Sequence, residues 1–521
     1  MQRVSRIKLK VGNIKDLIIA TRQYREKMLG DPYRPVFHFT VPDDNGMPGD
    51  SNGAFYADGV YHLMYLYKNS QTEAFHWGHI SSVDLLHWRH HPDALFDDGK
   101  QCDGCFSGGG FVDDDKVAYL TYWKFPSKVP GGDNGGIAIA CAKPPYEKWE
   151  RIEPIAVEET VWGIVDMEID GKIEHISCAD PSNIWKMNGK YYMQLGNLPV
   201  LNMYGREENS DPHYQGDWTD LFCSEDLKTW TFVHRFYENT HKDATWPDKT
   251  EDDMCPSFLP LFDKRENGSF TGKYLQLFIA HNRGCQYYIG TLEGETFIPE
   301  QHGRMSWNDI AYFAPEALID DKNRHIIWTW LHGNPENDFE KYGWSGVFCF
   351  PRTVWYEDGI LKMAPAGELD RLEYNTEIPT IGEDGGVSAQ NGEVFRLKAV
   401  IHAESSDKIG FAVRVDEKTG QKTEIYYDAL AGKLVFDATN SGVDGYRIKE
   451  EAPFALAEGE KLTLDIFVDK SVVEVYANDR QAICRRVYPA CPEIATKIMF
   501  IGNKNEIEEI KISDMAPTNP Y

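Results

Sequence analysis

Met47-Pro48-Gly49-Asp50-Ser51-Asn52-Gly53 opens the first strongly apolar segment of the chain, the aromatic-rich run 54–67. A carboxylate at the head of an apolar strand costs free energy unless it is paired or has chemical work to do. Asp50 is therefore the first candidate functional residue. The strand expected after it is the unit with which later segments are compared.

The pattern of this stretch returns four times. Each unit has a small or polar head, an apolar strand, a tight turn such as Ala57-Asp58-Gly59, and a second strand dense in Tyr, Trp, Leu and Ile. The heads follow one another at steps of 56, 74, 75 and 59 residues, which suit four-stranded propeller blades. The sequence thus predicts a five-bladed β-propeller whose five heads meet around one central cavity. The four later heads are Phe106-Ser107-Gly108, Asp180-Pro181, Cys255-Pro256 and Ala314-Pro315.

A second signal recurs further along two of the units. It reads Ser82-Val83-Asp84-Leu85-Leu86-His87-Trp88 in the first and Ser224-Glu225-Asp226-Leu227-Lys228-Thr229-Trp230 in the third. Ser and Asp at these positions favour a tight turn held by side chain to backbone hydrogen bonds. We therefore expect a turn between outer strands, followed by a tryptophan packed between blades.

Composition limits the class of partner. The chain has 521 residues and a formal net charge of −28, which argues against nucleic acid or an anionic membrane. Its ten cysteines include one close pair, Cys102 and Cys105, with no second pair at zinc spacing. We expect reduced thiols, no metal, and a cytoplasmic protein.

The chain divides into an N-terminal extension and two β-domains. Residues 1–32 predict a helix that starts at Asn13 and packs outside the ring, leaving a homo-oligomer contact open. Residues 33–365 carry the repeats, 366–390 read as a linker, and 391–521 alternate as in a β-sandwich. The expected class is all-β, a propeller followed by a sandwich.

Several of these motifs occur in the order found in one enzyme family. These motifs are Phe37-His38, Asp50-Ser51-Asn52-Gly53, His76-Trp77-Gly78-His79, Asp84-Leu85-Leu86-His87-Trp88, Gly104-Cys105-Phe106-Ser107-Gly108, Ala179-Asp180-Pro181, Cys255-Pro256 and Asp469-Lys470-Ser471-Val472-Val473-Glu474-Val475-Tyr476-Ala477-Asn478-Asp479. Through them the chain resembles glycoside hydrolase family 32, the invertase, inulinase and levanase family of β-fructofuranosidases, from Phe37 to about Ser513.

The resemblance implies a retaining glycosidase without a cofactor. It implies that Asp50 is the nucleophile and that Asp180 steadies the sugar in the transition state. The family's general acid, a glutamate before Cys-Pro, is replaced here by Met254. Side chains that would flank a fructosyl ring in the family are replaced at Gly49, Leu66, Thr72 and Ala179. The expected substrate is therefore an oligosaccharide or glycoside of a furanosyl or related sugar, other than sucrose.

Three explanations of Met254 remain open. A neighbouring carboxyl group supplies the proton, with Asp253 preferred over Glu316, although Asp252 and Asp253 also read as a solvated charged loop. Alternatively the leaving group needs little help, or the substrate provides the acid. In the third explanation the site binds sugar without cleaving it.

The remaining candidates are expected to contact the sugar. They are Asn52, Phe106, Ser107, Trp77 and Glu316, although Ser107 also fits a purely structural role at the start of a strand. The insertion 209–220, with Tyr214, reads either as a rim for further sugar units or as a packed surface loop.

Overall fold

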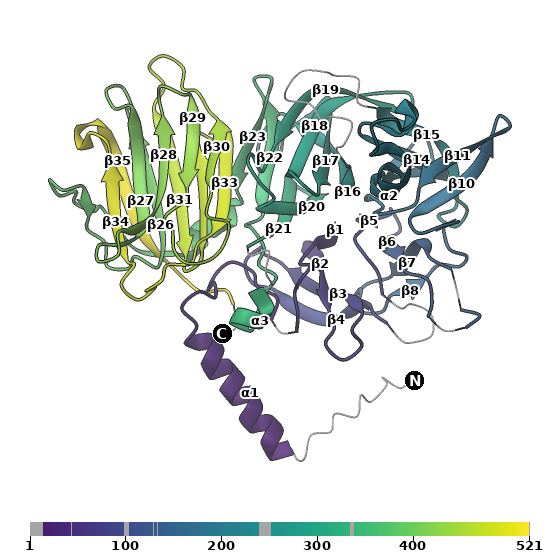
Figure 1. The fold of residues 1–521 in the computed structure, drawn as a ribbon, viewed down its shortest axis with the longest axis horizontal. Helices are drawn as coiled ribbons and strands as arrows, with labels where there is room; N and C mark the ends of the chain where they lie inside the picture. The colour runs from purple at the N-terminus through teal and green to yellow at the C-terminus, as the bar shows by residue number, and fades with distance from the viewer. Residues whose placement is uncertain are drawn as a thin grey trace.

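The computed structural model describes residues 14–42, 44–97, 104–128, 130–132, 134–238, 252–333 and 338–519. It confirms the predicted all-β class: a ring of five β-sheets lies beside a two-sheet sandwich (Figure 1). Within those ranges no helix has the length and apolar character needed to cross a bilayer. Cys102 lies outside them, and the nine described cysteines are free thiols.

Each blade is an antiparallel sheet whose strands follow one another in sequence order. The first two blades contain β1 (Ser51–Ala57), β2 (Val60–Lys68), β3 (Phe75–Ser82), β4 (Arg89–Leu95), and β5 (Gly110–Val112), β6 (Ala118–Lys124), β7 (Gly136–Ala142), β8 (Glu150–Arg151), with β9 (Val157–Glu158) added on β7. A separate hairpin follows, β10 (Ile164–Ile169) and β11 (Lys172–Ser177).

The last three blades complete the ring. The third and fourth contain β12 (Trp185–Met187), β13 (Lys190–Gly196), β14 (Trp218–Ser224), β15 (Thr231–Glu238), and β16 (Met254–Phe262), β17 (Phe270–Ala280), β18 (Gly284–Glu293), β19 (Thr296–Arg304). The fifth contains β20 (Tyr312–Ile319), β21 (His325–Leu331), β22 (Arg352–Glu357) and β23 (Ile360–Pro365).

The predicted turns form as expected. Asp58 and Gly59 both have positive φ between β1 and β2, the geometry that suits the right-handed twist of a two-residue hairpin. Between β3 and β4, Asp84 accepts from the backbone N–H groups of Leu86 and His87. The following Trp88 lies edge-on to Trp328 of the fifth blade, as predicted for a tryptophan between blades.

Backbone irregularities place the blade heads at the centre of the ring. The register of β1, β16 and β20 shifts at the first residues of each strand. Asp180, Cys255 and Ala314 have positive φ at the same level. A bulge re-aims the side chains next to it. The heads therefore turn into the centre of the ring instead of alternating across the sheet.

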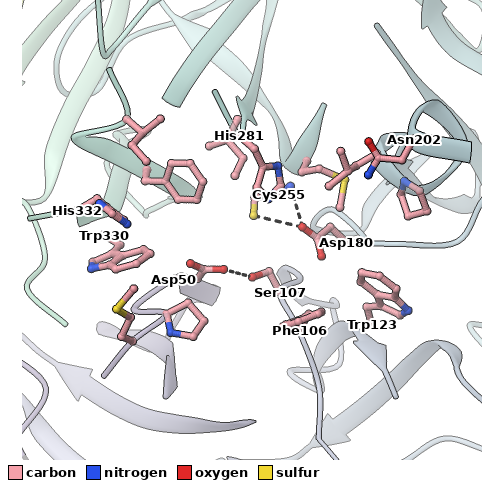
Figure 2. Close-up of a pocket in the computed structure, with 18 of the residues that line it drawn as sticks. Asp50, Phe106, Ser107, Trp123, Asp180, Asn202, Cys255, His281, Trp330 and His332 are labelled. Atoms are coloured by element: carbon pink, nitrogen blue, oxygen red, sulfur yellow. Dashed lines mark hydrogen bonds between the residues drawn. The ribbon is translucent and has the colours of Figure 1, made fainter. Parts of the chain in front are cut away.

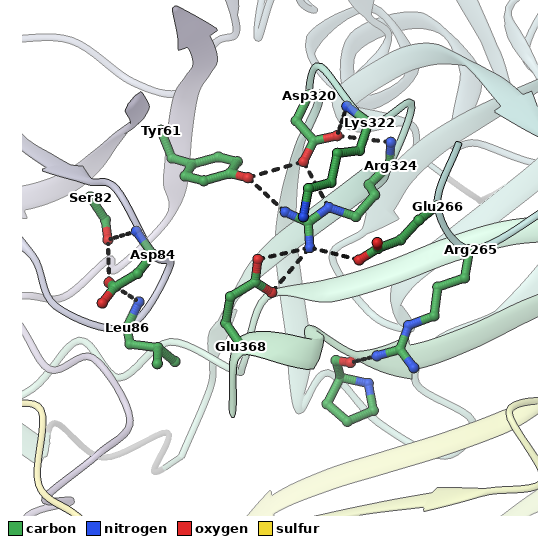
Figure 3. A network of polar contacts seen from close by, with 11 residues as sticks. Tyr61, Ser82, Asp84, Leu86, Arg265, Glu266, Asp320, Lys322, Arg324 and Glu368 are labelled. Atoms are coloured by element: carbon green, nitrogen blue, oxygen red, sulfur yellow. Dashed lines mark hydrogen bonds and ion pairs between the residues drawn. The ribbon is translucent and has the colours of Figure 1, made fainter. Parts of the chain in front are cut away.

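Two buried contacts close the ring between its first and last blades. Ser51 Oγ donates to the carbonyl oxygens of Ala314 and Trp328, at 2.9 and 3.1 Å. Farther from the centre, Arg324 binds Asp320 of its own blade and the Tyr61 hydroxyl of the first blade (Figure 3).

The sandwich stacks two six-stranded sheets, and one edge strand of each sheet lies within the expected linker 366–390. The segment is therefore part of the sandwich, because β24 pairs with β35 and β25 pairs with β34. One sheet contains β24 (Glu373–Glu377), β35 (Ile507–Met515), β26 (Val394–Ile401), β31 (Leu462–Asp469), β32 (Val472–Ala477) and β33 (Gln481–Arg486). The other contains β25 (Gly386–Val387), β34 (Lys497–Ile501), β27 (Lys408–Asp416), β28 (Gln421–Asp428), β29 (Lys433–Asp437) and β30 (Lys449–Pro453).

The sandwich motif at 469–479 contacts the segment that precedes the first blade. The Asp469 carboxylate accepts from the backbone N–H groups of Val36, Phe37 and His38 and pairs with the His38 ring at 2.9 Å. Phe37, His38 and Asp469 are buried. The motif therefore fixes the sandwich against the propeller and lies outside the central cavity.

Short helical segments complete the fold, and the first differs from expectation. The helix α1 (Ile14–Leu29) extends away from both domains in Figure 1, and Met28 is its one buried residue. The prediction that it packs on the ring is therefore wrong, and Asn13 lies outside the described residues. The other segments are α2 (Leu198–Val200), α3 (Asp338–Tyr342), η1 (Leu201–Gly205), η2 (Pro212–Tyr214), η3 (Gly367–Leu372) and η4 (Lys504–Glu506).

Candidate active site

A cavity of about 970 Å³ occupies the centre of the propeller. All five blades contribute side chains from the heads of their innermost strands, as the repeat predicts (Figure 2). Its wall is mostly aromatic and aliphatic, with few polar groups. The lining residues at the heads are Asp50, Phe106, Ser107, Asp180, Met254, Cys255 and Phe313.

Asp50 lies at the cavity wall, directly before β1. Its side chain accepts a hydrogen bond from Ser107 Oγ at 2.5 Å, and the residue is 9% exposed. Burial raises the pKa of its carboxyl group to about 6, while the Ser107 hydrogen bond and the charge of His281 oppose the rise. Asp50 is therefore mostly a carboxylate at neutral pH, held in one orientation.

Asp180 lines the same cavity from the third blade. Its Oδ2 accepts from the backbone N–H of Cys255 at 3.3 Å and from the Cys255 thiol at 3.4 Å. Burial raises the pKa of Asp180, and Asp180 in turn raises the pKa of Asp50 through its charge. The two aspartates thus act on each other across one pocket, although 130 positions separate them in the sequence.

His281, which no pattern in the sequence predicted as a site residue, also lines the cavity. His281 lies in the turn between β17 and β18, and its Nδ1 is 2.6 Å from Oδ2 of Asp252. The same carboxylate accepts from the His281 backbone N–H. The Asp252 side chain is 2% exposed, whereas that of His281 is 51% exposed. The repeat carries no signal for His281, because turn residues are not part of the head pattern.

The assignment of Asp253 as the acid is wrong on geometric grounds. Its side chain is fully buried and does not line the cavity. Neither carboxyl oxygen has a hydrogen-bond partner among the described residues, and burial with the charge of Asp217 raises its pKa well above the usual value. The alternative of a solvated loop is wrong too, because Asp252 is only 1% exposed.

Two other predicted sugar contacts instead join neighbouring blades. Asn52 Oδ1 accepts from the Gly108 N–H of the second blade, and Glu316 Oε1 accepts from the Ala54 N–H of the first. Both side chains are buried outside the cavity. Asn183 joins the third and fourth blades in the same way as Asn52 joins the first and second, because its Oδ1 accepts from the Phe258 N–H.

Trp77 also lies outside the cavity. It is fully buried, and its Nε1 donates to the carbonyl oxygen of Phe106 at 3.2 Å. Phe106 and Ser107 themselves line the cavity. Trp77 therefore supports the Phe106 backbone from behind.

The rest of the wall comes from residues outside the predicted set. The insertion 209–220 is a packed loop, since Tyr214 is buried against Trp218 and hydrogen-bonds to Glu174. The neighbouring segment 198–203 reaches the cavity in its place. Trp330 lies near the end of β21, and a tryptophan at such a position was a sequence signal that could have indicated a lining residue. The missed lining residues are Asn45, Trp123, Trp162, Leu198, Pro199, Asn202, Met203, Ile279, Ile310, Phe313, Trp330 and His332.

The described part of the chain contains no cluster of metal-ligating side chains. No group of three or more His, Cys, Asp or Glu side chains there could hold an ion. The titratable side chains around the cavity are Asp50, Asp180, Cys255, His281 and His332.

Comparison with known proteins gives the same architecture and a family. Residues 38–365 match the glycosyl hydrolases family 32 N-terminal domain, and residues 368–514 match the family 32 C-terminal domain. The crystal structure of fructan 1-exohydrolase IIa from Cichorium intybus superimposes with a TM-score of 0.74 at 18% identity. The match covers 94% of this chain and 98% of that one. That enzyme has also been solved, as a variant, in complex with 1-kestose.

Curated relatives extend over most of the chain. A raffinose invertase from Escherichia coli is 26% identical over 473 residues, which cover 88% of this chain and 90% of that protein. A levanase from Bacillus subtilis is 25% identical over 508 residues, covering 88% of this chain and 67% of that protein. The chain belongs to glycosyl hydrolase family 32, the retaining, β-fructofuranosidase-type hydrolases.

Proposed function

We propose that this protein cleaves a furanoside by a retaining mechanism with Asp50 as nucleophile. The observation that carries the proposal is an oriented carboxylate at the wall of the cavity, bound to Ser107 and facing a second carboxyl group, Asp180. A retaining glycosidase needs an ionised carboxylate that attacks the anomeric carbon. A pKa of about 6 keeps Asp50 ionised at neutral pH.

Asp180 is proposed to stabilise the sugar as positive charge develops at the anomeric carbon. Its burial beside Asp50 supports this role, because a carboxylate acts more strongly on a nearby charge in a site shielded from water. Cys255 holds one oxygen of Asp180 from behind, which fixes its direction. The other oxygen remains to act on the sugar ring.

We further propose that the site lacks the family's carboxylic acid at the expected position. Met254 is 2% exposed and lines the cavity there. A thioether has no proton to donate to a leaving oxygen. Met254 therefore contributes apolar surface, and help for the leaving group has to come from another residue or from the chemistry of the leaving group.

The lining favours a substrate that carries an apolar group next to the furanosyl unit. Trp123, Trp162, Phe313 and Trp330 dominate the wall. A second sugar such as glucose would bring several hydroxyl groups to a wall with few partners for them, and unpaired buried hydroxyls cost binding free energy. We propose aryl or alkyl furanosides as better substrates than sucrose.

A panel of aryl furanosides, alkyl furanosides and fructans tests this function. We expect turnover of furanosides by the wild type and none by Asp50→Asn. Equal activity of both proteins would remove Asp50 as nucleophile. Saturable sugar binding without turnover of any member of the panel would favour the alternative, a carbohydrate-binding protein. A methionine at position 254, in place of an acid, is compatible with that alternative.

A further inference from the structure

His281 combines an ordered ring, access to the cavity and a strong partner. Its backbone N–H and its Nδ1 are both bound by the Asp252 carboxylate, with Nδ1 at 2.6 Å. Asp252 is held in turn by Arg206, whose guanidinium lies 3.7 Å from Oδ1. With Nδ1 occupied, Nε2 is the ring nitrogen left to act in the cavity, which His281 shares with Asp50 and Asp180 (Figure 2).

The other titratable groups of the cavity do not suit the role of acid. Burial lowers the pKa of His332 to about 4, so its ring is neutral at pH 7, and its Nδ1 is bound to the Tyr446 hydroxyl. The Cys255 thiol is bound to Asp180, and burial raises its pKa well above the usual value. Asp50 and Asp180 already have roles in the proposed reaction.

We propose that His281, oriented by Asp252, is the general acid and base of this site and replaces the carboxylic acid that Met254 cannot supply. This inference rests on the proposed function of Asp50. An aspartate bound to Nδ1 of a histidine fixes the ring and stabilises its charged form, while Nε2 exchanges the proton.

The two steps balance with the groups present. In the first, an Asp50 oxygen forms a bond to the anomeric carbon. The bond from that carbon to the leaving oxygen breaks, and the leaving oxygen takes the proton from His281 Nε2. In the second, a water oxygen attacks the anomeric carbon and the bond to Asp50 breaks. The neutral His281 ring removes a proton from that water, which restores both residues.

The charges around His281 favour the protonated ring at the start of the cycle. Burial lowers its pKa, but the Asp252 hydrogen bond and the negative charges of Asp252, Asp180 and Asp50 outweigh burial and raise it above 6.5. Asp50 must lose its proton and His281 must keep one. Activity should therefore fall below about pH 6, where Asp50 protonates, and again on the alkaline side of the profile, above the raised pKa at which His281 deprotonates.

The test is His281→Asn measured with a series of furanosides that differ in leaving-group pKa. The Asn amide keeps a donor for Asp252 but carries no titrating proton. We expect kcat/KM to fall by about 10²- to 10⁴-fold for alkyl furanosides and far less for nitrophenyl furanosides, which leave without a proton. The alkaline limb of the pH profile should disappear, and added imidazole should restore part of the alkyl activity.

The chain offers a matched control in His87. Its backbone N–H and its Nδ1 are both bound to Asp84, at 2.9 Å each, in an exposed turn outside the cavity. His87→Asn should match the wild type. Asp252→Asn should move the alkaline limb to lower pH, as expected of a positioning residue, and a merely structural role would leave that limb in place.

The outcomes separate this inference from the proposed function. If Asp50→Asn abolishes cleavage of all furanosides while His281→Asn loses both leaving-group classes equally, or keeps its alkaline limb, the acid role of His281 is overturned and Asp50 stands. Absence of turnover by the wild type on the whole series overturns both.

Discussion

Two buried acidic clusters differ in whether an arginine accompanies the carboxylates. In the cluster of Figure 3, the Arg324 guanidinium pairs with Asp320 at 2.7 Å and with Glu368 at 2.9 and 3.0 Å. In the central cavity, Asp50 and Asp180 face each other, and no lysine or arginine of the described chain lines the wall. In these two clusters, the carboxylates paired with an arginine hold the ring together, whereas Asp50 and Asp180, which have no lysine or arginine partner among the described residues of the cavity, are costly to bury and serve the proposed chemistry.

The largest effect that tests this contrast is the loss of rate in Asp50→Asn. An amide cannot form the glycosyl ester, so kcat/KM for aryl furanosides should fall by about 10⁴-fold or more. Steady-state kinetics, with circular dichroism to verify folding, measures it. A loss below tenfold would mean that the cavity carboxylates are not used for attack.

The second effect is on stability at the other cluster. Arg324→Met leaves buried carboxylates without their cation, and the free energy of unfolding should drop by about 3–5 kcal/mol. Denaturant unfolding measures it. Arg22→Met is the matched control, since Arg22 pairs with Glu26 at 2.9 Å on an exposed helix and should change stability by less than about 0.5 kcal/mol. Equal effects at the two arginines would erase the contrast.

The third effect is the loss of stability that comes from burying the ionised Asp50 carboxylate. Its pKa of about 6 in the folded state exceeds the ordinary aspartate value of 3.8, so the ionised form destabilises the fold above pH 6 by about 3 kcal/mol. Asp50→Asn should therefore unfold at a higher temperature than the wild type at pH 7. The gap should shrink as pH falls from 6 toward 4, because the folded state then takes up the proton. Thermal melts of both proteins at several pH values measure it, and a constant gap would contradict the raised pKa.

The smallest effect is expected at Glu316. Gln keeps the oxygen that accepts from the Ala54 N–H, so Glu316→Gln should change stability by about 1 kcal/mol or less and leave cleavage of alkyl furanosides unchanged. The leaving-group series used for His281 measures it. Selective loss of alkyl cleavage in this variant would return the acid role to Glu316.

The sequence predicted the site residues that belong to its repeating pattern. The heads at Asp50, Ser107 and Asp180 line the cavity because the same strand pattern recurs in every blade. Asn52 and Glu316 were misassigned because their partners lie on neighbouring blades, and the register between blades leaves no trace in one sequence.

His281 escaped prediction for a related reason. Its contact with Asp252 depends on the lengths of β16 and β17, which bring the start of one strand beside the turn after the next. Asp252 and Asp253 looked alike in sequence, in a run of charged residues. The fold separates them, because Asp252 binds the turn while the Asp253 side chain is buried away from the cavity.

The central claim is that Asp50 becomes covalently bound to the sugar during turnover. The most direct measurement is rapid acid quench of the wild type with an aryl furanoside, followed by mass spectrometry of the intact protein and of its peptides. The account predicts one added glycosyl mass, on the peptide that contains Asp50, and none in Asp50→Asn. A glycosyl adduct on any other residue, or turnover that yields the inverted anomer without an adduct, would contradict it.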